Sequence, residues 1–109
     1  MRITAAIALA FLIGTATANE IFTSKDLDDT TMSLELFQDQ CVNAKILAWL
    51  VLNVNMPYVQ RFQRARLHWK GKDWASCWID IDGLVYSVDE EGVKLLPPIP
   101  RAMFKDTSV

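Results

Sequence analysis

The feature that most restricts the fold of this chain is Asp82-Gly83, which lies between two segments rich in β-forming residues. This pair is typical of a two-residue type I′ hairpin turn, in which both central residues need positive φ. If Ile81 faces Leu84, then Cys77 faces Val88, and every other pair of the hairpin is fixed. Side chains alternate between faces along a strand, so the hairpin has two distinct faces. One face carries Ala75, Cys77, Ile79, Ile81, Leu84, Tyr86 and Val88; the other carries Trp74, Ser76, Trp78, Asp80, Val85, Ser87 and Asp89.

The same alternation predicts another strand just before this hairpin. Ala65, Leu67 and Trp69 alternate with basic residues, which indicates a half-buried strand with a basic outer face. The basic face consists of Arg64, Arg66, His68 and Lys70. "KGKD" (70–73) and "DEEG" (89–92) are typical of turns, and residues 93–96 are expected to form a short strand that ends at the proline segment 97–100.

The apolar segment from Leu34 to Met56 is expected to be the main helix. Ser33 or Asp39 is a candidate N-cap, and Pro57 gives a stop because the residue before proline avoids the α region. "ILAWLVL" (46–52) is apolar on all sides, so the helix should be largely buried. A buried strand is the competing interpretation of this short run.

The N-terminus has the pattern of a secretory signal peptide. Arg2 precedes an apolar run of 11 residues, 3–13, and Ala16-Thr17-Ala18 gives a small-x-small cleavage site. The run is shorter than the roughly 20 residues that a spanning helix needs. We therefore expect residues 1–18 to be removed and the protein to be periplasmic or secreted, with no stable membrane insertion afterwards. A polar acidic arm (19–33), extended or frayed, should precede the domain (34–105), and residues 106–109 should fray.

Cys41 and Cys77 are the only cysteines, and in an exported protein such a pair most often forms a disulfide. A helix packed on the apolar face of the hairpin would bring them together. Catalysis by Cys77 would need a base in reach, and His68 lies on the other side of its strand. One histidine and two cysteines without ligand spacing make a poor metal set, so no cofactor is expected. The formal net charge of −2, with export, argues against nucleic acid.

Trp74 and Trp78 lie on the face opposite Cys77. If that face is uncovered, they form an aromatic surface near the basic residues Arg64, Arg66 and His68, and such surfaces mark partner sites. The competing interpretation is that the N-terminal arm or the C-terminal tail covers them. An enzymatic alternative would use the acids Asp80, Asp89 and Glu90 in a small hydrolase or a cation-dependent enzyme.

The C-terminal half resembles a loosely defined group of small exported proteins from phages and proteobacteria. The resemblance is carried by "GKDWASCW", "VYSVDEEG" and a proline segment that ends in "MFK", over residues 71–104 together with Cys41. It implies export and supports a Cys41–Cys77 bridge, and it adds no catalytic residue. This chain departs from the group in its longer "LLPPIPRAMF" exit and its very apolar helix.

Together these observations predict an α+β domain, with one main buried helix packed on a three- to four-stranded antiparallel β-meander and one disulfide. The predicted function is that of a small exported, non-enzymatic interaction protein, phage-encoded in one interpretation, whose partner is an envelope or host protein. The candidate binding face comprises Trp74, Trp78, Arg64, Arg66 and His68.

Overall fold

The computed structural model describes residues 20–25, 30–94 and 97–107 of the chain. The predicted signal peptide (1–18) lies outside these residues. The elements, in chain order, are β1 (Glu20–Lys25), β2 (Thr31–Gln40), α1 (Ala44–Asn53), α2 (Met56–Val59), β3 (Gln63–Trp69), β4 (Lys72–Ile81), β5 (Leu84–Asp89), β6 (Ile99–Pro100), the 3₁₀ turn η1 (Arg101–Met103) and β7 (Lys105–Asp106).

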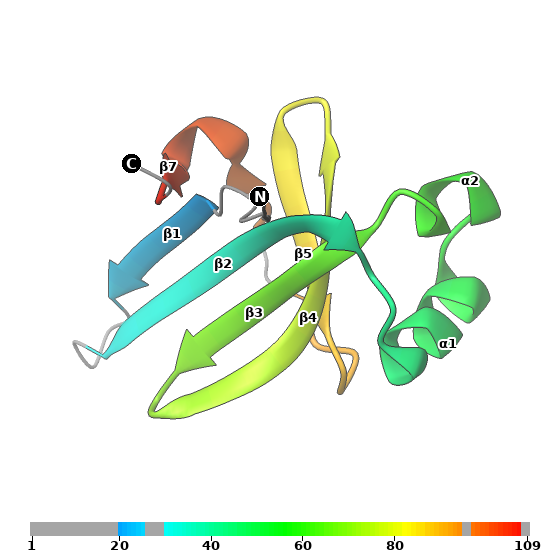
Figure 1. Ribbon diagram of the computed structural model, residues 1–109, viewed down its shortest axis with the longest axis horizontal. Helices are drawn as coiled ribbons and strands as arrows, with labels where there is room; N and C mark the ends of the chain where they lie inside the picture. The colour runs from blue at the N-terminus through cyan, green and yellow to red at the C-terminus, as the bar shows by residue number, and fades with distance from the viewer. Residues whose placement is uncertain (1–19, 26–29, 95–96, 108–109) are drawn as a thin grey trace, which may run out of the picture.

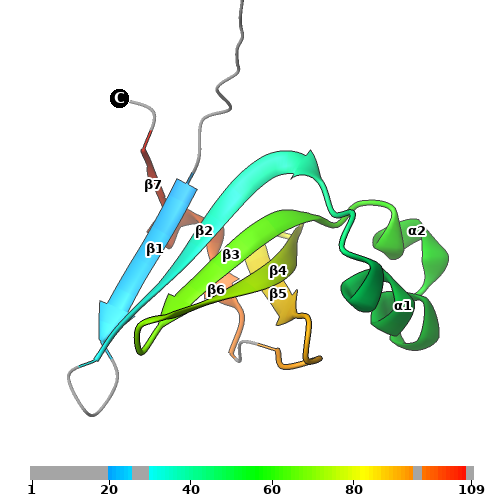
Figure 2. The ribbon, with the colours of Figure 1, turned by 60° about the horizontal axis from the view of Figure 1, so that its bottom comes forward.

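The strands form one antiparallel sheet in the order β6-β5-β4-β3-β2-β1-β7, which curves into a half-barrel. β6 and β7 lie at opposite edges of the sheet although they are neighbours in the chain, so η1 connects one edge to the other. The two helices lie together at one end of the curved sheet (Figures 1 and 2). The prediction of an α+β domain with a three- to four-stranded meander was therefore wrong, because the protein is mostly sheet.

The predicted helix over residues 34–56 was wrong over its first third. Residues 31–40 are β2, in which Leu34 and Leu36 face the concave side and pair with Leu67 and Ala65 of β3. The alternation of buried and exposed side chains in β2 arises only when β2 pairs with β3, which lies far along the chain. Local helix propensity therefore did not decide the structure of residues 31–40. The helix begins after its N-cap Asn43, not after Ser33 or Asp39.

The helix is also less buried than its composition predicted. Only Ile46 and Leu50 of α1 are fully buried, while Leu52 is 84% exposed. The reason is geometric: α1 packs with one side against the convex face of the sheet, and its other side meets solvent.

Both ends of the domain are more ordered than predicted. Residues 20–25 of the expected acidic arm form β1, which pairs with β2 over its whole length. Asp106, expected to fray, pairs with Glu20 in β7. Of the predicted strand 93–96, the described residues show one bridge, between Lys94 and Val88.

The hairpin and its register were predicted correctly. Ile81 pairs with Leu84 and Cys77 with Val88, and both Asp82 and Gly83 have positive φ. Lys70 and Gly71 form a second turn of the same kind between β3 and β4.

The alternation of side chains produces two cores, one on each face of the sheet. The convex core lies between the sheet and the helices: Cys41, Ile46, Leu50, Val59, Phe62, Cys77, Ile79 and Val88. The concave core lies inside the half-barrel: Leu34, Leu36, Ala65, Leu67, Trp78, Val85 and Phe104. Phe104, which follows η1, packs against Phe22 with ring centroids 5.6 Å apart, so the C-terminal segment closes the concave side.

Candidate functional site

The five residues of the predicted binding face lie on two different faces of the sheet. Trp74 and Trp78 face the concave side, whereas Arg64 pairs with Cys77 and therefore shares the convex side with it. Arg66 and His68 follow Arg64 at alternate positions of β3. The structure thus does not bring the tryptophans and the basic residues together.

Trp78 is covered by the C-terminal segment, as the competing interpretation proposed. Its side chain is only 2% exposed, and its Nε1 donates a hydrogen bond to the carbonyl of Phe37 at 3.0 Å. The guanidinium of Arg101 lies 4.7 Å from the centre of the Trp78 ring. Trp74 is half-buried and lines an apolar pocket of about 280 Å³ together with Met32, Leu67, Trp69 and Val93.

Two of the basic residues of β3, Arg64 and His68, contact acids of the neighbouring strands. Nε of Arg64 donates to Asp39 at 2.8 Å, and the guanidinium lies 3.8 Å above the Phe37 ring. The hydrogen bond from Arg64 holds the pKa of the Asp39 carboxyl below its usual range. His68 contacts Asp73. The opposite charges of the sequence therefore attract one another across the sheet.

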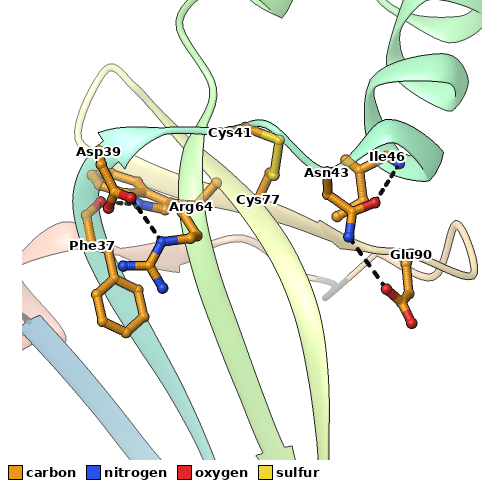
Figure 3. The surroundings of a disulfide bond; sticks show 9 residues. Phe37, Asp39, Cys41, Asn43, Ile46, Arg64, Cys77 and Glu90 are labelled. Atoms are coloured by element: carbon orange, nitrogen blue, oxygen red, sulfur yellow. Dashed lines mark hydrogen bonds and ion pairs between the residues drawn. A yellow bond between two sulfur atoms is a disulfide. The ribbon is translucent and has the colours of Figure 1, made fainter.

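The predicted disulfide between Cys41 and Cys77 is present, with Cα atoms 5.7 Å apart and both cysteines buried. It joins the end of β2 to the middle of β4 and lies at the foot of α1 (Figure 3). Beside it, Asn43 Oδ1 accepts a hydrogen bond from the backbone N–H of Ile46 and caps the helix. Asn43 Nδ2 donates to Glu90 at 3.3 Å, which ties the cap to the turn after β5.

Each of the three acids of the enzymatic alternative has a structural partner. Asp80 accepts from Arg101, Glu90 accepts from Asn43, and Asp89 Oδ1 accepts from the backbone N–H groups of Glu91 and Val93. Asp80 and Asp89 lie four residues apart along the β4–β5 ladder, a distance of about 13 Å. This exceeds the roughly 9.5 Å at which paired carboxylates cooperate in glycoside hydrolysis.

The most exposed apolar surface lies on the two helices. Four large apolar residues within eight consecutive positions are exposed to solvent: Val51 and Leu52 at the end of α1, and Met56 and Tyr58 in α2. We call these four residues the helical corner. Contiguous exposed apolar surface on a small protein marks an interaction site.

A pocket of about 320 Å³ opens beside the helical corner, between the helices and the convex face of the sheet. It is lined by Trp49, Leu50, Asn53, Val54, Tyr58, Phe62, Ile79, Ile81, Tyr86, Ser87, Val88 and Lys94. Tyr58 belongs to both the corner and the pocket, so the two meet at this residue.

Positive charges border this surface. Lys45 is the only charged residue between Asp39 and Arg61. It lies seven residues before Leu52 and therefore on the same side of α1, about two turns away. Arg61 lies over the Tyr58 ring at 5.7 Å, and Lys94 lies 5.7 Å from the Trp49 ring.

One feature of the sequence indicates this exposed helix, and the prediction of a largely buried helix misread it. The uncharged stretch 46–60, bordered by Lys45 and Arg61, indicated burial when read alone. A continuous apolar run is equally compatible with a helix whose second side is a binding surface, and tertiary packing decides between the two.

Neither a membrane-crossing helix nor a cluster of metal-binding side chains occurs in the part of the chain that the structure describes. Comparison of the whole chain with protein-family models, with curated proteins and with solved structures found no match.

Proposed function

We propose that this chain is an exported, non-enzymatic binding protein whose helical corner docks on an envelope or host protein. The observation that carries the proposal is the exposure of Val51, Leu52, Met56 and Tyr58 beside an apolar pocket. Tyr, Met and Arg are residue types enriched at the centres of protein interfaces; the corner contains Met56 and Tyr58, and Arg61 lies at its border. The disulfide fits an oxidising compartment, which supports export.

The charged residues around the helical corner indicate the chemistry of the partner. Lys45, Arg61 and Lys94 favour an apolar partner surface with acidic residues around it. A second copy of the chain fits less well. A two-fold interface through the corner would bring Lys45 and Arg61 of both copies to one interface, and residues 40–60 contain no acid to neutralise them.

The test compares matched charge insertions in a pull-down from envelope or host extract with the oxidised protein. Val51 and Val93 are 55% and 57% exposed, so Val51→Asp and Val93→Asp add the same charge at equal exposure. Val51→Asp and Leu52→Asp should weaken capture of the partner by roughly tenfold or more, because an apolar contact is lost. Val93→Asp should not change it. Lys45→Glu should weaken capture more at low salt than at high salt.

Three controls decide the outcome. Thermal unfolding of each variant shows that the fold is kept. Sedimentation of the chain alone detects self-association, and flotation with anionic vesicles detects lipid binding. Loss of dimers or of vesicle binding in Leu52→Asp, or equal capture by Val51→Asp and the wild type, would overturn the assignment of a protein partner to the helical corner.

A further inference from the structure

All four glutamines of the chain line a single cleft next to the pocket beside the helical corner, and Phe62 and Ile79 line both. Gln38 and Gln40 come from the end of β2, and Gln60 and Gln63 come from the junction of α2 and β3. The cleft has a volume of about 480 Å³, within the usual range of small-molecule sites. Four amide side chains gathered from two chain segments make a polar, uncharged lining.

A bulge in β2 opens this cleft. Leu36 pairs with Ala65 and Gln40 with Gln63, so β2 has three residues where β3 has one. The carbonyls that the bulge frees are used by side chains: Phe37 O accepts from Trp78 Nε1, and Gln38 O accepts from Gln63 Nε2 at 2.9 Å. Bulges are common at the rims of barrels and next to binding sites.

The charges around the cleft balance one another. Arg101 donates to both Glu20 and Asp80, and Arg61 Nη2 donates to the carbonyl of Asp80 at 3.1 Å. Hydrogen bonding with Glu20 raises the pKa of Arg101 above its usual value. Arg101 thus meets two carboxylates, and the charges of Arg61, Arg101, Glu20 and Asp80 sum to zero, so the cleft favours a ligand without net charge.

The free hydrogen-bonding capacity of the cleft lies in its amides. Gln40 and Gln60 are exposed, and their side chains make no hydrogen bond within the described part of the chain. An amide offers donors and an acceptor together, which matches hydroxyl groups, each of which both donates and accepts. Phe62, Ile79 and Trp78 give the cleft an apolar floor.

An extended peptide fits this cleft less well. Peptides that are recognised through their backbone usually add a strand to a free sheet edge. β2 beyond Leu36 and β4 beyond Trp78 each extend past one of their neighbouring strands at the cleft. The carbonyls of Phe37, Gln38 and Asp80 in these segments already accept hydrogen bonds from side chains, so they are not available to an added strand.

From these observations we propose that the glutamine cleft binds a neutral oligosaccharide. The cleft adjoins the pocket beside the helical corner and shares Phe62 and Ile79 with it, but the ligands and the side chains that would hold them differ. The corner would hold a protein, and the cleft would hold a glycan unit by hydrogen bonds from Gln40 and Gln60. In an exported protein both ligands are available at a cell surface.

The test is NMR titration of the full oxidised chain with trisaccharides of glucose and of N-acetylglucosamine. The side-chain amides are direct reporters, because every glutamine lines the cleft while Asn53 and Asn55 lie on the helices. The glutamine signals should shift saturably with at least one of the two sugars, and the Asn53 and Asn55 signals should not shift.

A double variant, Gln40→Ala with Gln60→Ala, should reduce the affinity about tenfold or more, because two hydrogen-bonding groups are lost. Its backbone spectrum should match the wild type away from the cleft. Leu52→Asp should bind the sugar as the wild type does, which separates this proposal from that for the helical corner. If neither trisaccharide shifts the glutamines at millimolar concentration, if only peptides do, or if the double variant binds equally well, the proposal is wrong.

Discussion

Removal of the Cys41–Cys77 disulfide should destabilise the protein by about 4 kcal/mol. The bond closes a loop with a sequence separation of 36, and in the chain-entropy model such a loop restricts the unfolded state by that amount at 25 °C. Native small domains are stable by only about 5 to 15 kcal/mol, so this loss is large. The perturbation is the double variant Cys41→Ala with Cys77→Ala.

Urea unfolding of the oxidised wild type and the double variant measures the effect. With an m-value of about 2 kcal/mol/M, the midpoint should fall by about 2 M. Reduction of the wild type is the matched control, because it breaks the same bond and keeps both sulfur atoms. A loss below about 1 kcal/mol in both samples would refute the entropic reasoning.

The position of the bond predicts where the loss appears first. The closed loop contains α1, α2 and β3, while the concave core lies mostly outside it. In hydrogen exchange, the amides of α1 should therefore lose protection before those of β5 when the bond is reduced. A uniform loss of amide protection across the sheet and the helices would show that the disulfide does not stabilise the helical segment in particular.

Three further predictions test single contacts. Asn43→Ala should cost about 1 kcal/mol in urea unfolding because it removes the side-chain cap of α1, whereas Asn55→Ala should cost less than about 0.5 kcal/mol because Asn55 makes no such bond to α2. Arg64→Gln should raise the pKa of Asp39 toward 3.8 in an NMR titration. In the wild type, this pair makes a small contribution to stability that is present above pH 3.8 and is lost as the pH falls through the lowered pKa of the folded state. An unchanged Asp39 titration in the variant would count against the pairing. Arg101→Met should cost about 1 to 2 kcal/mol in thermal unfolding because two carboxylates lose their common partner, and a neutral effect would show that this ion pair is not stabilising.

Local turn chemistry explains what could be predicted from the sequence. Asp82-Gly83 and Lys70-Gly71 determine two hairpins through their own backbone preferences, and the alternation on either side determines the register. The disulfide could be predicted for the same reason, because the register placed Cys77 on the face that a helix would cover.

The remaining errors concern contacts between distant segments. Residues 31–36 become a strand because β1 and β3 pair with this segment on either side, and no local signal shows that pairing. β6 and β7 are two residues long each, too short for any periodicity, and exist because the edges of the sheet accept them. The separation of the tryptophans from the arginines follows from the β3–β4 register, which pairs Arg64 with Cys77. The covering of Trp78 was not predictable from local signals, because the closure of the concave face by Phe104 depends on the C-terminal crossing.

The same architecture explains how a small protein can keep an apolar helix partly exposed. A helix of ten residues is marginal alone, and α1 buries only Ile46 and Leu50 completely. The disulfide at its foot and the Asn43 cap supply the attachment that hydrophobic burial does not. Because α1 is held from one side and one end, its other side is free to present Leu52. A helix stabilised by burial alone would need to bury more apolar residues than Ile46 and Leu50. The disulfide therefore allows α1 to be stable while Leu52 stays exposed.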